Sequence, residues 1–409
     1  MEQYVKDQIT YGLKYLPANL IKSIFIKKSS KQTEEFRKNG FICGICHAHS
    51  EYDLLHEANI EWLRSDVPFP FLPDGSKNPI FEYYKQELKR HHDNGIKVMA
   101  VTPYPQSYLE VGADIRTEEG TKKVIEITKY IFDEIKDYVG GIQITNEMGM
   151  PRFTIPFTMD EAVKFIGVQL EALYPIRGDI KIGYNCAGPA ADLLSKLRPY
   201  NKYCDYLGVD IYIGCFGAIY QPMWLYNVLL NYYWAMTKLP IIIQEFGYIS
   251  GGHPKTKAQK LALLNKYGVK DFKEAKAKTD VLVSNLPDDF NARVKQLSEG
   301  DPNRYYNLLF KSDLRDHLYC ELPRVQKIPF CDHTLEGQAR FYDKVFKRIF
   351  KKKFVCGTVI YCFSDSKSCY VCGQDECPIE TRWGIVDRDK KPKPAFFSVK
   401  KAFAQIQGK

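Results

Sequence analysis

The 409-residue sequence predicts an α/β protein whose eight parallel strands close into a (β/α)8 barrel. Three observations predict this fold. From residue 41 onward, eight short apolar segments alternate with longer amphipathic ones, as in repeated β-α units. Some apolar segments, such as 240–243, contain no polar residue, which suits strands covered on both faces. Polar residues gather just after the apolar segments, where barrel enzymes build their active sites from βα loops.

The expected elements follow from these patterns. The eight strands are expected at 41–46, 60–64, 96–101, 141–145, 180–184, 206–212, 240–244 and 354–362. Helices between them are expected at 81–92, 120–138, 159–172 and 335–350.

Two regions lie outside this alternation. Residues 1–40 predict an N-terminal helical extension, because apolar residues recur at helical spacing in its first half. Residues 41–409 form the expected catalytic barrel, and 251–334 interrupt it after the seventh strand. That segment is charged, helical in pattern at 257–267 and 290–297, and too long for an ordinary βα loop, so we expect a helical insertion.

Composition narrows the classes of protein. The chain has 58 Lys and Arg against 49 Asp and Glu, which gives 58 − 49 = +9, and the excess is spread over the whole sequence. Hydrophobic residues at 45% and charged residues at 26% argue against disordered, collagen-like and coiled-coil classes. We expect no nucleic acid partner, because no interleaved basic and aromatic motif occurs.

The chain has twelve cysteines, so the compartment decides whether they are free thiols or disulfides. We expect a reducing compartment. The apolar stretch 11–26 is broken by Lys14, Pro17 and Lys22, so no secretory signal is recognised. No run reaches the roughly 18 apolar residues of a membrane span. We therefore expect a cytoplasmic protein with mostly free thiols and no membrane partner.

Two glutamates at strand ends are the strongest functional signal. Glu147 follows the fourth expected strand and Glu245 follows the seventh. In a closed barrel these ends face the same mouth. A carboxyl pair across one cavity is the minimum equipment for glycosidic bond hydrolysis. Each glutamate alone could equally be a helix-capping or ion-pairing residue.

Further residues sharpen this signal. Asn146 precedes Glu147, Arg64 lies on strand two and Tyr212 ends strand six. A closing segment at 383–389 precedes Lys391-Pro392-Lys393-Pro394-Ala395. Together these features resemble the retaining glycoside hydrolases of clan A, the barrel superfamily of cellulases, mannanases, β-glucosidases and β-xylosidases. The resemblance runs from residue 41 to the C-terminus, without the insertion.

The resemblance implies catalytic roles. It makes Glu147 the general acid/base and Glu245 the nucleophile. A proton donor needs a raised pKa, whereas a nucleophile must stay ionised, which Arg64 and Tyr212 beside Glu245 would favour. Asn146 would hydrogen-bond the sugar hydroxyl next to the reacting carbon.

One departure from the clan concerns the sugar platform. Its members commonly carry Trp at the end of strand eight, where this chain has Phe363, so either Phe363 or Trp383 is expected to replace it. Tyr104, after strand three, is expected near the substrate. His47 and His49 are expected to line the sugar site or to serve a structural role.

His47 and His49 also raise a rival reaction class. An HxH motif after strand one begins the site of metal-dependent amidohydrolase barrels, which need further histidines after strands five and six. None of the eight histidines lies there, so this class is disfavoured. Cys369, Cys372 and Cys377 leave a structural metal or a disulfide open as the minor alternative to free thiols.

The sequence thus predicts a retaining glycosidase that cleaves a β-linked glycoside or oligosaccharide, without a cofactor. Transglycosylation on the same site remains open, since both reactions share the covalent step. A non-catalytic carbohydrate-binding barrel is the non-enzymatic alternative. The sugar, the linkage, endo or exo action and the oligomeric state are left open.

Overall fold

The computed structural model describes residues 3–25, 29–215, 221–251, 257–285, 327–369 and 380–409. Eight parallel strands pair in sequence order, and β8 pairs with β1, so the sheet closes into a barrel. The strands are β1 (Ile42–Cys46), β2 (Trp62–Asp66), β3 (Lys97–Val101), β4 (Gly141–Ile144), β5 (Lys181–Ala187), β6 (Tyr206–Asp210), β7 (Ile241–Phe246) and β8 (Val355–Ile360). The predicted (β/α)8 barrel is confirmed.

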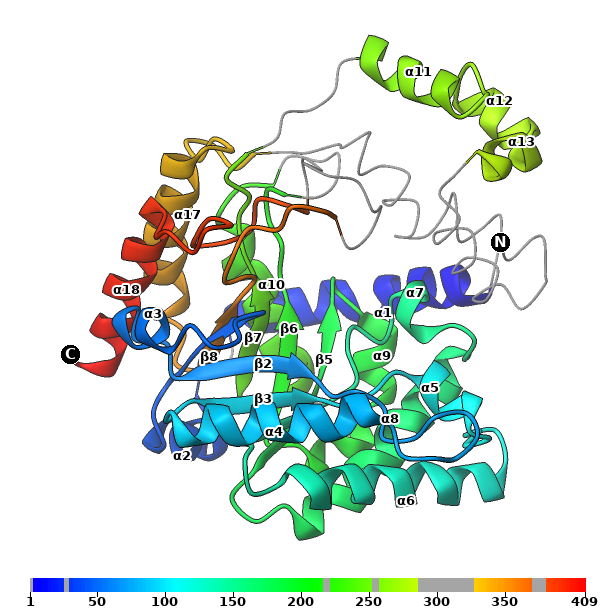
Figure 1. Ribbon diagram of the computed structural model, residues 1–409, viewed down its shortest axis with the longest axis vertical. Coiled ribbons are helices and arrows are strands. Elements are labelled where there is room, and N and C mark those ends of the chain that lie inside the picture. The colour runs from blue at the N-terminus through cyan, green and yellow to red at the C-terminus, as the bar shows by residue number, and fades with distance from the viewer. Residues whose placement is uncertain (1–2, 26–28, 216–220, 252–256, 286–326, 370–379) are drawn as a thin grey trace.

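Helices surround the strands in Figure 1. They are α2 (Lys31–Lys38), α3 (Tyr52–Glu57), α4 (Pro79–Asp93), α5 (Pro105–Glu110), α6 (Glu118–Ile135), α7 (Pro151–Thr154), α8 (Met159–Leu173), α9 (Ala191–Lys196), α10 (Leu225–Thr237), α17 (Leu335–Ile349) and α18 (Pro394–Gln407), with 3-10 turns η1 (Tyr174–Ile176) and η2 (Arg198–Tyr203). The four helices expected between strands are all present, and their ends differ from the expected ones by at most three residues.

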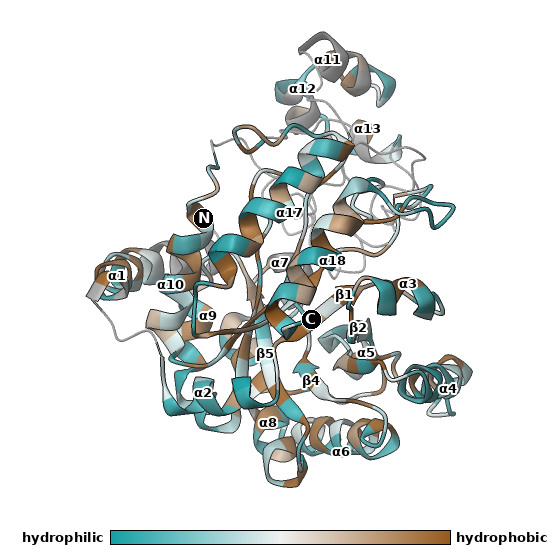
Figure 2. Cartoon of the chain, turned by 90° about the vertical axis from the view of Figure 1, so that its left-hand side faces the viewer, coloured by the Kyte–Doolittle hydropathy of each residue, from teal (hydrophilic) through white to brown (hydrophobic). Residues whose placement is uncertain are grey.

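Local sequence explains where these helices begin. Thr158 accepts a hydrogen bond from the Glu161 backbone while the Glu161 side chain returns to the Thr158 N–H, which closes a capping box at the start of α8. Thr334 caps α17 by one bond only, which its side chain accepts from the Gly337 N–H. The buried residues of α17 recur at helical spacing and face the barrel, and Figure 2 shows helices that are hydrophilic on one side and hydrophobic on the other.

The N-terminal helix α1 (Gln3–Phe25) packs against α9 and α10 on the outside of the barrel (Figures 1 and 2). The insertion contributes α11 (Lys257–Lys266), α12 (Phe272–Ala277) and α13 (Thr279–Ser284). The helix expected at 290–297 lies outside the described residues. Sequence analysis missed α10, which is apolar around most of its circumference and has little helical periodicity.

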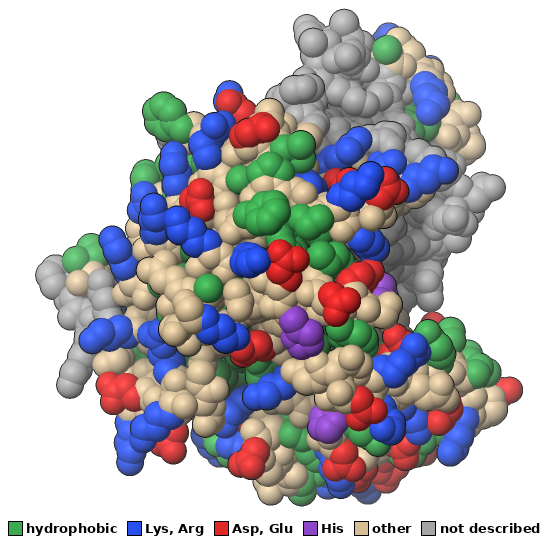
Figure 3. All heavy atoms as spheres, turned by 60° about the vertical axis from the view of Figure 1, so that its left-hand side comes forward, with side chains coloured by type: hydrophobic (Ala, Val, Ile, Leu, Met, Phe, Trp, Pro, Cys, Tyr) green, Lys and Arg blue, Asp and Glu red, His purple; other side chains and the backbone are tan. Residues whose placement is uncertain are grey.

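Two other properties bear on the expectations from composition. Within the described residues, no helix is both long and apolar enough to cross a bilayer. Figure 3 shows basic and acidic side chains intermingled over the face it presents, so the net charge is not gathered in one patch there.

Candidate active site

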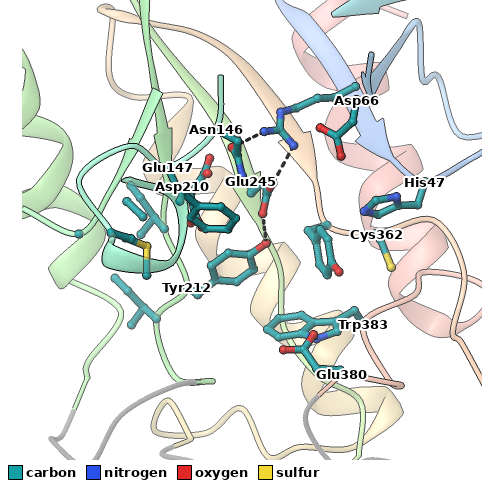
Figure 4. Close-up of a pocket in the computed structure, with 18 of the residues that line it drawn as sticks. His47, Asp66, Asn146, Glu147, Asp210, Tyr212, Glu245, Cys362, Glu380 and Trp383 are labelled. Carbon is teal, nitrogen blue, oxygen red and sulfur yellow. Dashed lines mark hydrogen bonds and ion pairs between the residues drawn. The ribbon is translucent and has the colours of Figure 1, made fainter. Parts of the chain in front are cut away.

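A cavity of about 750 Å3 opens at the carboxyl ends of the barrel strands. Side chains from the ends of β1, β2, β4, β6, β7 and β8 converge on it, as expected for a barrel enzyme. Figure 4 shows the central group, which includes both glutamates singled out from the sequence. Of the predicted site residues, those that line the cavity are His47, His49, Arg64, Tyr104, Asn146, Glu147, Tyr212, Glu245 and Trp383.

The Glu245 carboxylate is held at both oxygens. Arg64 donates from Nη1 to Oε1 at 2.6 Å, and the Tyr212 hydroxyl donates to Oε2, also at 2.6 Å. The two charged side chains are 5% and 13% exposed. Charge-assisted hydrogen bonds of this length are strong, so they fix the position of the carboxylate. These are the two contacts expected from the sequence.

The Tyr212 hydroxyl stays a donor throughout the neutral range. Burial, followed by the neighbouring Glu245 carboxylate, raises the pKa of Tyr212 well above its ordinary value. The guanidinium of Arg64 is likewise permanently charged: burial opposes the charge, but the Glu245 carboxylate raises the pKa of Arg64 well above its ordinary value.

Arg64 also links Glu245 to strand β4. Its Nε donates to Gln143 Oε1 at 2.8 Å, and its Nη2 donates to Asn146 Oδ1 at 2.6 Å. Asn146 Oδ1 accepts two further bonds, from Gln143 Nε2 at 3.1 Å and from Asn185 Nδ2 at 2.8 Å. With its oxygen engaged three times, the amide orientation of Asn146 is fixed.

Glu147 is placed by its backbone. Both Thr145 and Glu147 adopt positive φ values, 50° and 45°, which L-residues rarely adopt. The Glu147 N–H donates to Asn185 Oδ1 at 2.7 Å, and the Thr145 N–H donates to Thr102 Oγ1 at 2.9 Å. Such strained backbone persists only where its surroundings fix it, and it is concentrated at functional sites.

Aromatic side chains form another wall of the cavity. The Trp383 ring lies 5.2 Å from Tyr212 and 5.7 Å from Tyr361, measured between ring centroids. His47 contacts Tyr361 edge to face at 5.2 Å. Burial in the barrel mouth lowers the pKa of His47, against the opposing effect of the nearby Glu245 and Asp66 carboxylates. The exposed surface of His47 faces the cavity.

Phe363 is not part of this wall. Its N–H donates to the Cys46 carbonyl at 3.0 Å, so the backbone keeps its hydrogen bonding to β1 beyond the end of β8. The ring is fully buried in the core, and Tyr361 lines the cavity in its place. The expectation that Phe363 substitutes for a sugar-platform Trp is therefore wrong, while Trp383 does reach the cavity from the following loop.

Several cavity residues were missed from the sequence. Asp66 and Asp210 end β2 and β6 and line the cavity. Asn185 on β5 and Gln143 on β4 are buried behind it and bind Asn146. The rule that polar residues at strand ends mark the site could have found the two aspartates. Strand β2 begins and ends two residues later than expected, which is why Asp66 was overlooked.

No group of three or more His, Cys, Asp or Glu side chains in the described part of the chain is arranged to hold a metal ion. His47 and His49 both line the cavity. Cys369 is a buried free thiol, whereas Cys372 and Cys377 lie outside the described residues, so the idea of a metal or disulfide in that loop stays a prediction.

No protein-family profile matches the sequence, and no curated protein matches it. Solved structures do match in fold. A GH2 β-galacturonidase from Eisenbergiella tayi has a TM-score of 0.50 at 13% identity, over 89% of this chain and 51% of that one. A β-glucuronidase from Ruminococcus gnavus gives 0.50 at 12% identity, over 89% and 49%.

A third match is a family 39 glycoside hydrolase from Bacteroides cellulosilyticus WH2, with a TM-score of 0.54 at 12% identity over 89% of this chain and 63% of that one. The chain thus spans about half to under two thirds of the length of these proteins. At such low identity the likeness is one of fold, and it agrees with the closed barrel.

Proposed function

We propose that this protein is a retaining glycoside hydrolase that cleaves a β-linked glycoside by double displacement. One observation carries the proposal: Glu245 is held by Arg64 and Tyr212 in a cavity that it shares with Glu147. A second carboxyl group in such a cavity supplies the proton donor that glycoside cleavage needs. That structures of the same fold include glycosidases adds support.

In the first step, a Glu245 oxygen attacks the anomeric carbon as the bond to the leaving oxygen breaks. Glu147 gives its proton to that oxygen, so the aglycone leaves as an alcohol. In the second step, Glu147 removes a proton from water, whose oxygen displaces Glu245 and restores the carboxylate. Retention by this route requires a separation of about 5–5.5 Å between the two carboxyl groups.

Asn146 is suited to assist the charged transition state. Because its Oδ1 already accepts bonds from Arg64, Gln143 and Asn185, its Nδ2 is the end left for Tyr104 and the cavity. A donor there would bind the hydroxyl next to the reacting carbon, an interaction that strengthens as positive charge develops.

The charges of the cavity favour a sugar without a carboxylate. Among its described lining residues, the Lys and Arg side chains are Arg64 and Lys390. Arg64 is bound to Glu245, and Lys390 pairs with Glu51 at 2.9 Å. Each cation is thus already neutralised, so a neutral glycone fits these residues better than a uronate.

The test is a panel of 4-nitrophenyl β-glycosides that covers glucoside, galactoside, xyloside, mannoside and glucuronide, followed by proton NMR of the first-formed product. A 2-deoxy-2-fluoro glycoside of the preferred sugar should slow the second step and label the peptide that contains Glu245. Glu147→Gln and Glu245→Ala are the controls. Undiminished cleavage by Glu245→Ala, or an inverted first product, would contradict the proposal.

A further inference from the structure

Asp66 is an exposed carboxylate in the cavity, and the mechanism above gives it no role. It ends β2, two residues after Arg64, and its side chain lines the cavity. Because the side chain is exposed there, a bound molecule can reach its oxygens. In Figure 4, Glu245 lies between Glu147 on one side and Asp66 with His47 on the other.

The Asp66 carboxylate has no counter-charge within the described part of the chain. No hydrogen bond or ion pair among the described residues ends on its oxygens. The Arg64 guanidinium is bound to Glu245 and Asn146 instead. Burial lowers the pKa of His47, so its imidazole is neutral at neutral pH and does not balance the charge. Asp66 therefore offers the cavity two oxygens that accept hydrogen bonds and donate none.

The proposed chemistry fixes how a sugar ring lies in the cavity. Glu245 attacks C1 and Glu147 protonates the leaving oxygen, so the leaving group lies on the Glu147 side. C3 and C4 lie across the ring from C1, and they therefore point away from the leaving group. Asp66 and His47 lie on that side of the cavity, at the ends of the neighbouring strands β2 and β1. The hydroxyls on C3 and C4 are adjacent donors, which the two oxygens of one carboxylate can accept together.

We propose that Asp66 binds the glycone by accepting hydrogen bonds from its hydroxyls on C3 and C4. Asp66 is thus a substrate-binding residue that sets specificity, and this inference rests on the proposed glycosidase function. The substrate class that fits is a glycone with both hydroxyls free, as in a simple glycoside or the terminal sugar of a chain. A sugar linked through either oxygen lacks one donor and covers the carboxylate without pairing it, which is unfavourable.

Substitutions at Asp66 test this contact on the preferred 4-nitrophenyl glycoside. Asp66→Ala removes both acceptors, so kcat/KM should fall about 10- to 150-fold, the contribution of a hydrogen bond to a charged group. Asp66→Asn keeps one acceptor and should give a smaller loss. Asp53 is an exposed aspartate of α3 that does not line the cavity. Asp53→Asn is the matched control, which removes the same charge as Asp66→Asn and should leave kcat/KM within about 2-fold.

Deoxy substrates distinguish a direct contact from a structural role. The 3-deoxy and 4-deoxy forms of the preferred glycoside each lack one proposed donor. The wild type should lose about 10-fold or more in kcat/KM on each, whereas Asp66→Ala should lose less than about 3-fold, because the acceptor is already gone. A structural role would lower the activity of Asp66→Ala equally on all three substrates.

A readout without cleavage separates this inference from the glycosidase proposal. NMR titrations with the methyl β-glycosides of glucose, galactose, xylose and mannose measure binding alone. We expect the wild type to bind at least one of them and Asp66→Ala to bind it about 10-fold more weakly. Binding that depends on Asp66, without cleavage of any aryl glycoside, would overturn the glycosidase proposal and leave this contact standing.

Three results would overturn the inference: equal kcat/KM in the wild type and Asp66→Ala, equal losses of both proteins on the deoxy substrates, or unchanged binding of methyl glycosides by Asp66→Ala. Thermal unfolding checks that each variant is folded. If Asp66→Ala does not fold, Asp66→Asn takes its place in all three measurements.

Discussion

Two buried ion pairs line or border the same cavity, and they are built differently. Arg64 and Glu245 form one, at 2.6 Å, and Lys393 and Asp365 form the other, at 3.0 Å with both side chains 4% exposed. The Asp365 carboxylate also accepts from the Gly384 N–H, and Lys393 also donates to Ser250 Oγ and the Gly384 carbonyl. Although Asp365 also lines the cavity, the second pair is more deeply enclosed by protein than the first.

This difference is the one expected between an ion pair that serves the proposed activity and an ion pair that serves folding. The Lys393 ammonium makes its bonds within the protein and ties the loop after β8 to the start of α18. Glu245 holds its charge at the edge of the cavity, where a substrate can reach it. Burial of a charge is costly unless it is paired, so the closed pair should matter for folding and the open pair for activity.

The largest expected effect is on activity, in Glu245→Gln. The variant retains an oxygen for Arg64 but loses the proposed nucleophile, so kcat should fall about 10^4-fold or more. The free energy of unfolding should fall by about 1–3 kcal/mol, because the buried Arg64 loses its counter-charge but keeps an oxygen to bind. Aryl glycoside kinetics and urea unfolding measure the two quantities. A loss of stability in Glu245→Gln as large as that in Lys393→Met would contradict the distinction between the two ion pairs.

The next effect is on stability, in Lys393→Met. The variant leaves the buried Asp365 carboxylate without its counter-charge, which should lower the free energy of unfolding by about 3–5 kcal/mol at neutral pH. Activity per folded molecule should stay within about 3-fold, since Lys393 does not contact the cavity. Asp365→Asn with Lys393→Met is the matched control, and it should recover most of the stability because no charge is left unpaired.

The stability loss in Lys393→Met should also depend on pH. Burial raises the pKa of Asp365, and Lys393 opposes this rise, so its removal raises the folded-state pKa further. Between the unfolded and folded values the folded state binds more protons, and stability therefore rises as pH falls. The deficit should shrink in acid as Asp365 becomes neutral. Urea unfolding at several pH values tests this, and a deficit that grows in acid would contradict it.

A smaller effect on activity is expected from Tyr212→Phe. This change removes the 2.6 Å hydrogen bond to Glu245 Oε2 and keeps the ring against Trp383. Hydrogen bonds to charged groups contribute about 1.5–3 kcal/mol, which corresponds to a loss of roughly 10- to 150-fold in kcat/KM. Because Tyr212 stays protonated, the loss should be the same across neutral pH. A loss that disappears at high pH would show that Tyr212 ionises there.

The sequence was sufficient for the barrel and for the strand ends that carry Glu147, Glu245, Arg64 and Tyr212. These follow from apolar runs and from the polar residues after them, which are local patterns. The role of Asn185 could not be predicted, because it depends on bonds to residues 38 and 39 positions away in the chain. Asp210 depends on the register shift between β6 and β7, which no local pattern records.

The prediction that Phe363 forms the sugar platform failed for a related reason. Side chains alternate along a strand, but beyond Ile360 the chain leaves β8, and the alternation no longer tells which residue faces the cavity. Tyr361 lines the cavity, while Phe363 is enclosed in the core with the Lys390 ammonium 5.4 Å from its ring centroid.

The smallest expected effects separate these two aromatic residues. Tyr361→Leu removes a cavity wall that contacts His47 and Trp383, so KM should rise about 3- to 10-fold with little change in the midpoint of unfolding. Phe363→Leu is its matched core control. It should lower the free energy of unfolding by about 1–2 kcal/mol and leave KM unchanged, because the ring is fully buried and does not itself line the cavity. If Phe363→Leu raised KM as much as Tyr361→Leu does, Phe363 would have to contribute to the sugar site after all.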